Sequence, residues 1–150
     1  MRVRFALNGS PVEVEAGTGE NLLTVLRRDL GVLSVRETCG IGVCGACTAL
    51  VDGEPISTCL LLAPLAEGTA ITTADGLADD HPVTRAFVEA HAFQCGFCTP
   101  GMVLTAAALL EESPSPTDAE IRLALAGNLC RCGCYVKILE AVRRAASWRS

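Results

Sequence analysis

Residues 39–59 read CGIGVCGACTALVDGEPISTC and contain four of the nine cysteines of this 150-residue chain. Three of the four follow the spacing Cys-x4-Cys-x2-Cys, and the fourth stands further along the chain. This spacing is typical of a loop that wraps a [2Fe-2S] cluster, with a distant fourth ligand. Intervening glycines let the backbone pass close to an inorganic core and turn its N–H groups toward sulfur. The stretch predicts a cluster whose ligands are Cys39, Cys44, Cys47 and Cys59.

Zinc and disulfides are the alternatives for so many cysteines. Zinc sites usually combine two short Cys-x2-4-Cys knuckles, whereas this loop offers three ligands together, which favours a cluster. A disulfide scaffold belongs to exported chains, but the first residues, MRVRFALNGSPVEVE, lack the apolar core of a signal peptide. We therefore expect a cytoplasmic chain, in a reducing compartment where clustered cysteines bind metal more often than they pair.

The first half of the chain has the pattern of a small strand-rich domain. Alternating runs flank Asn8-Gly9 and Asp52-Gly53, dipeptides that accept the positive φ angles of tight hairpin turns. Between the hairpins, leucines and a valine recur at helical spacing. We expect that helix to start with Thr18 as its cap and to stop at Gly31. Strands and one helix predict an α+β domain over residues 1–75.

The second half, residues 76–150, has the pattern of a four-helix bundle-like domain. Pro100 suits the first turn of a helix, and Thr117 and Glu120 form a capping box. The predicted helices cover residues 82–93, 100–113, 117–127 and 135–148.

A second group of cysteines lies in this helical half. Cys95 and Cys98 precede one predicted helix, and Cys130 and Cys132 precede another. Helix starts carry partial positive charge and free N–H groups, which favour an anionic four-thiolate site. The spacing alone indicates a metal site and leaves zinc open. Cys134 is then left over as a free, partly buried thiol, although chemistry alone does not choose between it and Cys132.

Composition and motifs restrict the possible functions. The formal net charge is −5 without a basic block, which argues against nucleic acid as a partner. The apolar stretches are too short to span a bilayer, so no membrane insertion is expected. Arg143, Arg144 and Arg149 are interpreted as the solvated end of a helix. His81 and His91 are interpreted as cap or surface residues, and no nucleophile motif or phosphate-binding loop occurs, so no catalytic residue is expected.

Three motifs together carry a resemblance to a known family. They are ETCGIGVCGACTALVDGEPISTC, FQCGFCTPGM and GNLCRC-x-x-Y-x-KI, and in this order they resemble the small iron-sulfur subunit of the xanthine oxidase family of molybdenum hydroxylases. The family includes carbon monoxide, quinoline and nicotinate-type dehydrogenases. The resemblance implies a β-grasp ferredoxin-like domain with the first cluster and a helical domain with a second [2Fe-2S] cluster. The ligands that it implies for the second cluster are Cys95, Cys98, Cys130 and Cys132.

The resemblance also implies a function and partners. Electrons would pass from molybdopterin on a large subunit, through the Cys95 cluster and then the Cys39 cluster, to FAD on a medium subunit. Gln94 and Cys132 match the family positions that approach the pterin, which bacterial relatives commonly carry as the cytosine dinucleotide. The assembly would be a heterotrimer or a dimer of heterotrimers, with substrate chemistry on another subunit.

The sequence departs from the family pattern after the second cysteine of CRCGCY. The family commonly has a threonine and a glycine there, whereas this chain has Gly133 and Cys134. The departure puts the local turn in question. Two rival functions stay open: a free-standing two-cluster ferredoxin and a zinc-stapled interaction module. The alanine-rich stretch MVLTAAALL, which is hard to bury within a small bundle, favours association with a partner.

Overall fold

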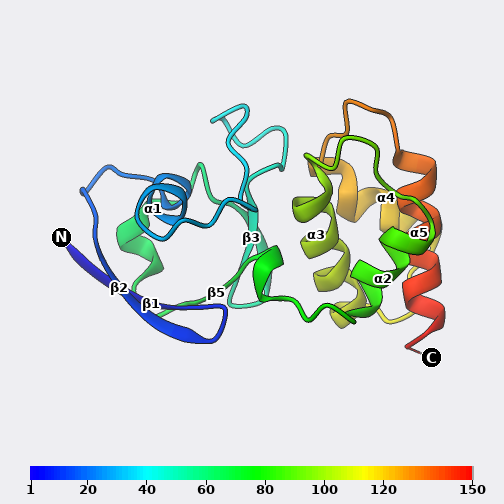
Figure 1. Ribbon diagram of the computed structural model, residues 1–150, viewed down its shortest axis with the longest axis horizontal. Coiled ribbons are helices and arrows are strands. Elements are labelled where there is room, and N and C mark those ends of the chain that lie inside the picture. The colour runs from blue at the N-terminus through cyan, green and yellow to red at the C-terminus, as the bar shows by residue number, and fades with distance from the viewer. Residues whose placement is uncertain (150) are drawn as a thin grey trace.

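A computed structural model describes residues 1–149, and it places the strands and the predicted four helices in two halves that lie side by side (Figure 1). The two ends of the chain lie at opposite ends of the long axis. Each half has its own hydrophobic core, one built from residues 3–71 and the other from residues 83–145. Ser150, the last residue of the predicted helical domain, lies outside the described residues.

The amino-terminal half is built on a mixed five-stranded sheet in the order β2-β1-β5-β3-β4. Both predicted hairpins are confirmed, with positive φ at both residues of the Asn8-Gly9 and Asp52-Gly53 turns. β1 and β5 pair in parallel, and β5 pairs antiparallel with β3. The strands are β1 (Arg2–Leu7), β2 (Ser10–Glu15), β3 (Thr48–Val51), β4 (Glu54–Ser57) and β5 (Ala70–Thr72).

The edge strands of this sheet are β2 and β4, and each carries a proline. Pro11 on β2 lies opposite Ala6, and Pro55 on β4 lies opposite Leu50. A proline has no N–H to donate, so edge positions are where a sheet tolerates it.

The helix α1 (Leu22–Arg28) packs against the sheet through Leu22, Val25 and Leu26, all fully buried. The predicted cap was wrong. The Asn21 side chain, not that of Thr18, accepts the hydrogen bond from the Thr24 N–H at 2.9 Å. Gly31 follows the helix with a φ of 66°, as expected for a stop signal.

The carboxy-terminal half contains the other four α-helices. Pro100 lies in the first turn of α3, and the capping box of Thr117 and Glu120 is present, as predicted. The helix predicted over residues 82–93 ends earlier, and His91 lies beyond it with a φ of 51°. The helices are α2 (Pro82–Glu89), α3 (Thr99–Glu112), α4 (Asp118–Ala124) and α5 (Tyr135–Ser147). Short 3-10 turns are η1 (Ala63–Ala66), η2 (Ala74–Gly76) and η3 (Leu125–Gly127).

The arginines that were interpreted as a solvated helix end have acidic partners on other elements. Arg143 forms an ion pair with Asp118, on α4. Arg144 reaches Glu89 on α2, and Arg149 pairs with Glu111 on α3. These pairs link the carboxy-terminal end of the chain to three helices, and because they are partly exposed each contributes at most about 1 kcal/mol.

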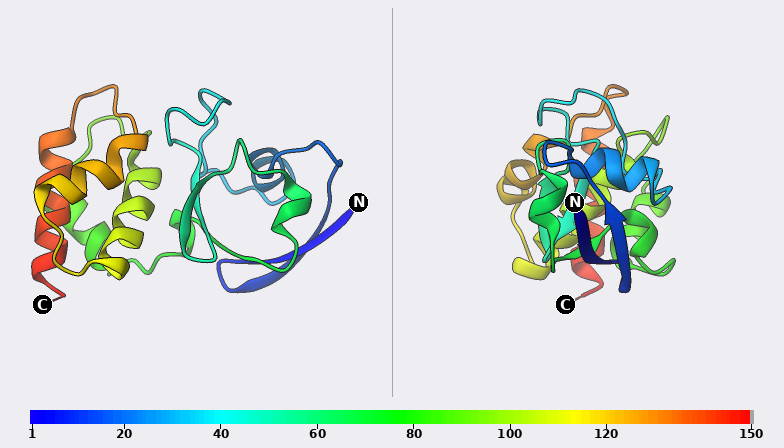
Figure 2. Two further views of the ribbon diagram at one scale, coloured as in Figure 1. Left: turned by 180° about the vertical axis from the view of Figure 1, so that it is seen from behind. Right: turned by 90° about the vertical axis from the view of Figure 1, so that its left-hand side faces the viewer.

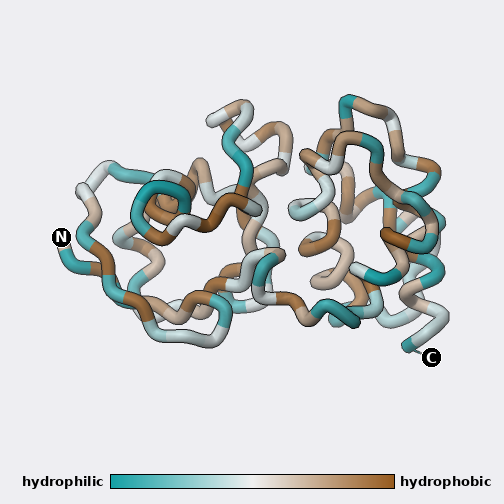
Figure 3. The backbone as a smooth tube through the Cα atoms, viewed as in Figure 1, coloured by the Kyte–Doolittle hydropathy of each residue, from teal (hydrophilic) through white to brown (hydrophobic). Residues whose placement is uncertain are grey.

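The helix α3 lies between the sheet and the other helices (Figures 1 and 2). It packs against β3 and β4 on one side and against α2 and α4 on the other. Its stretch MVLTAAALL is therefore buried within the chain itself, so the argument that this stretch needs a partner was wrong. Figure 3 shows the same helix as largely hydrophobic. Within residues 1–149, no helix is both long and apolar enough to cross a membrane.

Two candidate metal centres

All nine cysteines are free thiols, and contacts between thiols place the eight predicted ligands in two sets of four, with Cys134 beside the second set. The loops that carry them lie along one side of the molecule, at the top of Figure 1, and the view from behind in Figure 2 agrees. The first set comes from the loop before β3 and from Cys59 after β4. The second set comes from the segments that lead into α3 and α5.

The four thiols of the first set form two contacting pairs. The Cys39 thiol lies within hydrogen-bonding reach of the Cys44 thiol, and both side chains are half-buried. The thiols of Cys47 and Cys59 lie within reach of each other and are buried. The set thus has an outer pair and an inner pair.

Backbone N–H groups surround the outer sulfur of this first set. Hydrogen bonds from the N–H groups of Ile41, Cys44 and Val43 lower the pKa of the Cys39 thiol to about 6. Burial raises the pKa of Cys59 to about 11, although the Gly42 N–H acts in the opposite direction. The loop reaches this conformation through positive φ angles of 67°, 74° and 69° at Gly40, Gly42 and Gly45.

The second set repeats the outer and inner pairs on a different backbone. The thiols of Cys95 and Cys132 are exposed and in contact. The Cys98 thiol, at the residue that precedes α3, contacts the buried Cys130 thiol. Burial raises the pKa of Cys98 to about 12, whereas the Phe97 N–H lowers the pKa of Cys95.

N–H groups from the residues just before α3 and α5 also point at this second set. The Phe97 N–H donates to the Cys95 Sγ at 3.5 Å, and the Cys134 N–H donates to the Cys130 Sγ at 3.4 Å. The Cys130 N–H in turn donates to the Tyr135 hydroxyl at 2.8 Å. Sequence reasoning missed this role of Tyr135, although its tyrosine stands in the motif that carried the resemblance.

The donor sets fit two-iron clusters by their chemistry. A [2Fe-2S] cluster takes four thiolates, two on each iron, and each set here offers two contacting pairs. Donors directed at the sulfurs stabilise their thiolate forms. In the part of the chain that the structure describes, no three His, Cys, Asp or Glu side chains converge on a point that a single metal ion could occupy.

Comparison with known protein families matches both halves of the chain to domains that bind [2Fe-2S] clusters. Residues 5–78 match the 2Fe-2S iron-sulfur cluster binding domain, and residues 73–143 match the [2Fe-2S] binding domain. The chain is 47% identical to the nicotinate dehydrogenase small FeS subunit of Eubacterium barkeri, over 95% of this chain and 93% of that subunit. The chain belongs to the [2Fe-2S] subunits of the xanthine oxidase family of molybdenum hydroxylases.

Solved structures of this family have the same fold. Quinoline 2-oxidoreductase from Pseudomonas putida 86 matches with a TM-score of 0.93 and 39% identity, over 98% of this chain and 94% of that chain. Aldehyde oxidoreductase from Desulfovibrio desulfuricans matches with a TM-score of 0.94 and 36% identity. The match covers 99% of this subunit but only 17% of that longer chain. The two domain matches of this iron-sulfur subunit indicate two [2Fe-2S] clusters.

The turn that departs from the family pattern is unstrained in this subunit. Gly133 has a φ of 76° with open space where a Cβ would stand, so glycine suits this position. Cys134 is the residue before α5, and its thiol is half-buried beside Cys130. Burial and this contact raise the pKa of Cys134. The turn therefore uses a glycine one residue earlier than the pattern suggests.

Other predicted site residues lie where they can be assigned simple roles. Gln94 is exposed next to Cys95. The His81 ring accepts a hydrogen bond from the Val83 N–H at 3.3 Å and caps α2, and His91 is exposed. The interpretation of the histidines as cap and surface residues is confirmed.

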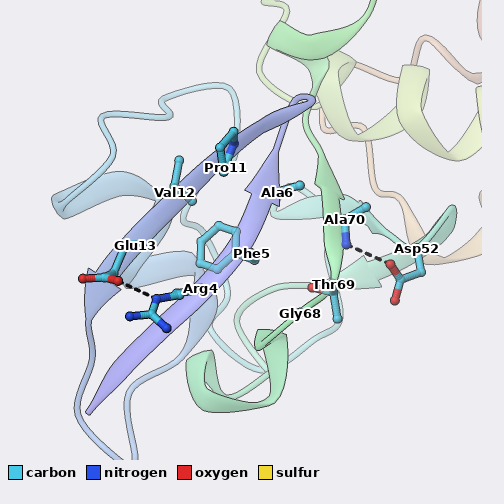
Figure 4. A pocket seen from close by; sticks show the side chains of 10 residues that line it. All are labelled: Arg4, Phe5, Ala6, Pro11, Val12, Glu13, Asp52, Gly68, Thr69 and Ala70. Atoms are coloured by element: carbon cyan, nitrogen blue, oxygen red, sulfur yellow. Dashed lines mark hydrogen bonds and ion pairs between the residues drawn. The ribbon is translucent and has the colours of Figure 1, made fainter.

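Two hollows differ in their relation to the cysteines. A groove of about 480 Å³ lies between the two sets and is lined by cysteines of both, including Cys44 and Cys130. Figure 4 shows another hollow, of about 540 Å³, on the sheet. Its polar groups are already paired, Glu13 with Arg4 and Asp52 with the Ala70 N–H. None of its lining residues is a cysteine, so it has no part in the metal centres.

Proposed function

We propose that the chain carries electrons from molybdopterin on a large partner subunit to FAD on a medium partner subunit. When bound, the two [2Fe-2S] clusters supply one-electron carriers in a rigid thiolate cage. The observation that carries the proposal is the presence of two four-thiol sets, one in each half of a chain that belongs to this family.

In this proposal each outer pair and each inner pair of thiols holds one iron. The outer and inner pairs of the first set are Cys39 with Cys44 and Cys47 with Cys59. The corresponding pairs of the second set are Cys95 with Cys132 and Cys98 with Cys130. Cys134 is not a ligand.

The two sets have different neighbours at the surface, which supports a direction for the relay. Gln94 and Cys132 are exposed on the second set, so this edge would face the pterin. Ile41 and Val43 are exposed on the loop of the first set, which would face the FAD subunit. Between the sets, the Leu129 N–H donates to the Cys44 carbonyl at 2.8 Å, which connects a proposed ligand of the first set to the residue before Cys130 in the second.

The family supports further parts of the proposal. Residues 1–75 form a β-grasp ferredoxin-like domain, and residues 76–150 form a four-helix bundle-like domain that holds the second cluster. The pterin is the cytosine dinucleotide form, and the cytoplasmic assembly is a heterotrimer or a dimer of heterotrimers.

The test is low-temperature EPR of the dithionite-reduced chain, with iron and acid-labile sulfide counted on the same sample. We expect two distinct S = ½ signals and about four irons per chain. One signal together with bound zinc would leave a single cluster and contradict the relay. The absence of both the EPR signals and acid-labile sulfide would contradict both clusters and would favour a zinc-stapled module instead.

A further inference from the structure

Asn128 is one of the few buried polar side chains of the described residues, with 4% of its surface exposed. It lies in the segment between α4 and α5, two residues before Cys130. A buried amide is costly unless its polar atoms find partners, so its contacts indicate what it does.

The Asn128 amide bonds to both halves of the molecule. Its Nδ2 group donates to the Gly45 carbonyl at 3.2 Å and to the Thr48 hydroxyl oxygen at 3.3 Å, both in the amino-terminal half. Its Oδ1 atom accepts from the Thr105 hydroxyl, on α3, at 3.0 Å. The orientation of the amide is unambiguous, because the Gly45 carbonyl can only accept.

Each of these partners belongs to a segment that carries cysteines. Gly45 lies between Cys44 and Cys47 in the loop of the first set. Thr105 lies on α3, the helix that starts directly after Cys98. Asn128 itself leads into Cys130. One side chain therefore joins segments that hold ligands of both sets.

Two glycines allow these segments to approach so closely. A Cβ on Gly45 would stand 2.3 Å from the Gly127 carbonyl oxygen and 2.6 Å from the Asn128 Nδ2. A Cβ on Gly101, in the first turn of α3, would stand 2.5 Å from the Gly45 carbonyl oxygen. The backbones are in direct contact at this point, so a shift of the amide would move one set of cysteines relative to the other.

We propose that Asn128 is a positioning residue that fixes the separation of the two proposed clusters and thereby the rate at which electrons pass between them. The inference rests on the proposed function, since without two clusters there is no separation to fix. Buried networks in which every polar group is satisfied favour one arrangement over its neighbours. Electron transfer needs such a fixed arrangement, because its rate falls steeply with distance.

The test compares variants of the full chain loaded with both clusters. Thr105→Val removes the donor to Oδ1, and Asn128→Asp replaces the Nδ2 donor with an oxygen that repels the Gly45 carbonyl. Thr105→Ser keeps the hydroxyl and serves as the rescue. Thr73→Val is the matched control, because the equally buried Thr73 hydroxyl accepts from the Asn8 side chain, at 3.0 Å, within the amino-terminal half.

The readout is the magnetic splitting between the two reduced clusters in EPR, which depends on their separation and which a loss of stability alone does not change. We expect Thr105→Val and Asn128→Asp to give a smaller and broader splitting at full iron content. Thr105→Ser and Thr73→Val should keep the wild-type splitting.

An unchanged splitting in Thr105→Val, with about four irons per chain, would overturn the inference, even if Asn128→Asp did not assemble. A wild-type chain without two clusters would instead contradict the proposed function, so iron content separates the two failures.

Discussion

The two cysteine sets reach similar arrangements from different backbones. In the first set, three glycines with positive φ bend one loop around its outer sulfur. In the second set, two separate segments supply the N–H groups, one before α3 and one before α5, and each donor directly follows a glycine with positive φ. Both sets nevertheless have an outer thiol with a lowered pKa and an inner thiol with a raised pKa. The shared requirement is N–H donors directed at sulfur, and either backbone meets it.

The largest expected effect is the loss of one cluster when an inner thiol is removed. We expect Cys47→Ser to lose only the first cluster and Cys98→Ser to lose only the second, because the halves have separate hydrophobic cores. Iron content should fall from about four to about two per chain, with one EPR signal retained. Loss of both signals from either variant would show that the two sets do not assemble independently.

The second-largest expected effect is a loss of folding stability from a substitution in the glycine loop of the first set. Gly45→Ala would combine the strain of a positive φ, about 1–2 kcal/mol, with the overpacking of its Cβ against Gly127 and Asn128, about 1–3 kcal/mol. Gly40→Ala is the control, because a Cβ there meets nothing within 4 Å and only the backbone strain applies. Denaturant unfolding of both variants measures the difference. Equal losses of stability would show that close packing at Gly45 is unimportant.

A third, smaller effect is a difference between the thiols in how their reaction with iodoacetamide depends on pH. In the metal-free, reduced chain, Cys39 has a pKa of about 6, below its usual value, so its reactive thiolate forms as the pH rises through 6. Cys59 and Cys98, with pKa values of about 11 and about 12, stay protonated up to pH 8. Iodoacetamide labelling, read by mass spectrometry between pH 5 and 8, should therefore modify Cys39 before Cys59 and Cys98. The same labelling order in the urea-unfolded chain would exclude the folded backbone as the cause.

The smallest expected effect is that of Cys134→Gly. We expect iron and sulfide contents to stay at the wild-type level, because the Cys134 N–H to the Cys130 Sγ survives the substitution. Cys132→Gly is the matched variant and should lose the second cluster. Loss of iron from Cys134→Gly would make that cysteine a ligand and change the assignment of the second set.

Local interactions explain which parts of the fold could be predicted from the sequence. The turns at Asn8-Gly9 and Asp52-Gly53 depend on neighbouring residues alone, so their patterns were sufficient. The prediction of Thr18 as the cap of α1 was wrong because the Glu20 carboxylate accepts a hydrogen bond from the Gly17 N–H. This bond forms a turn at these residues, and the helix starts only after it.

The candidate site likewise has parts that the sequence predicted and parts that it did not. The spacing predicted two groups of cysteines, but it did not indicate which thiols are in contact or that Cys134 would lie against Cys130. The role of Asn128 depends on its contact with Gly45, far away in the sequence. The burial of α3 depends likewise on the sheet half covering it. Such contacts between distant segments leave no periodic signal in a single sequence.

The prolines on the edge strands have a consequence for a chain that must find partner subunits. An open sheet edge is a template on which a second copy can add a strand, which leads to aggregation. Pro11 on β2 and Pro55 on β4 each remove an N–H from such an edge. Both open borders of the sheet therefore resist the addition of a strand from a second copy.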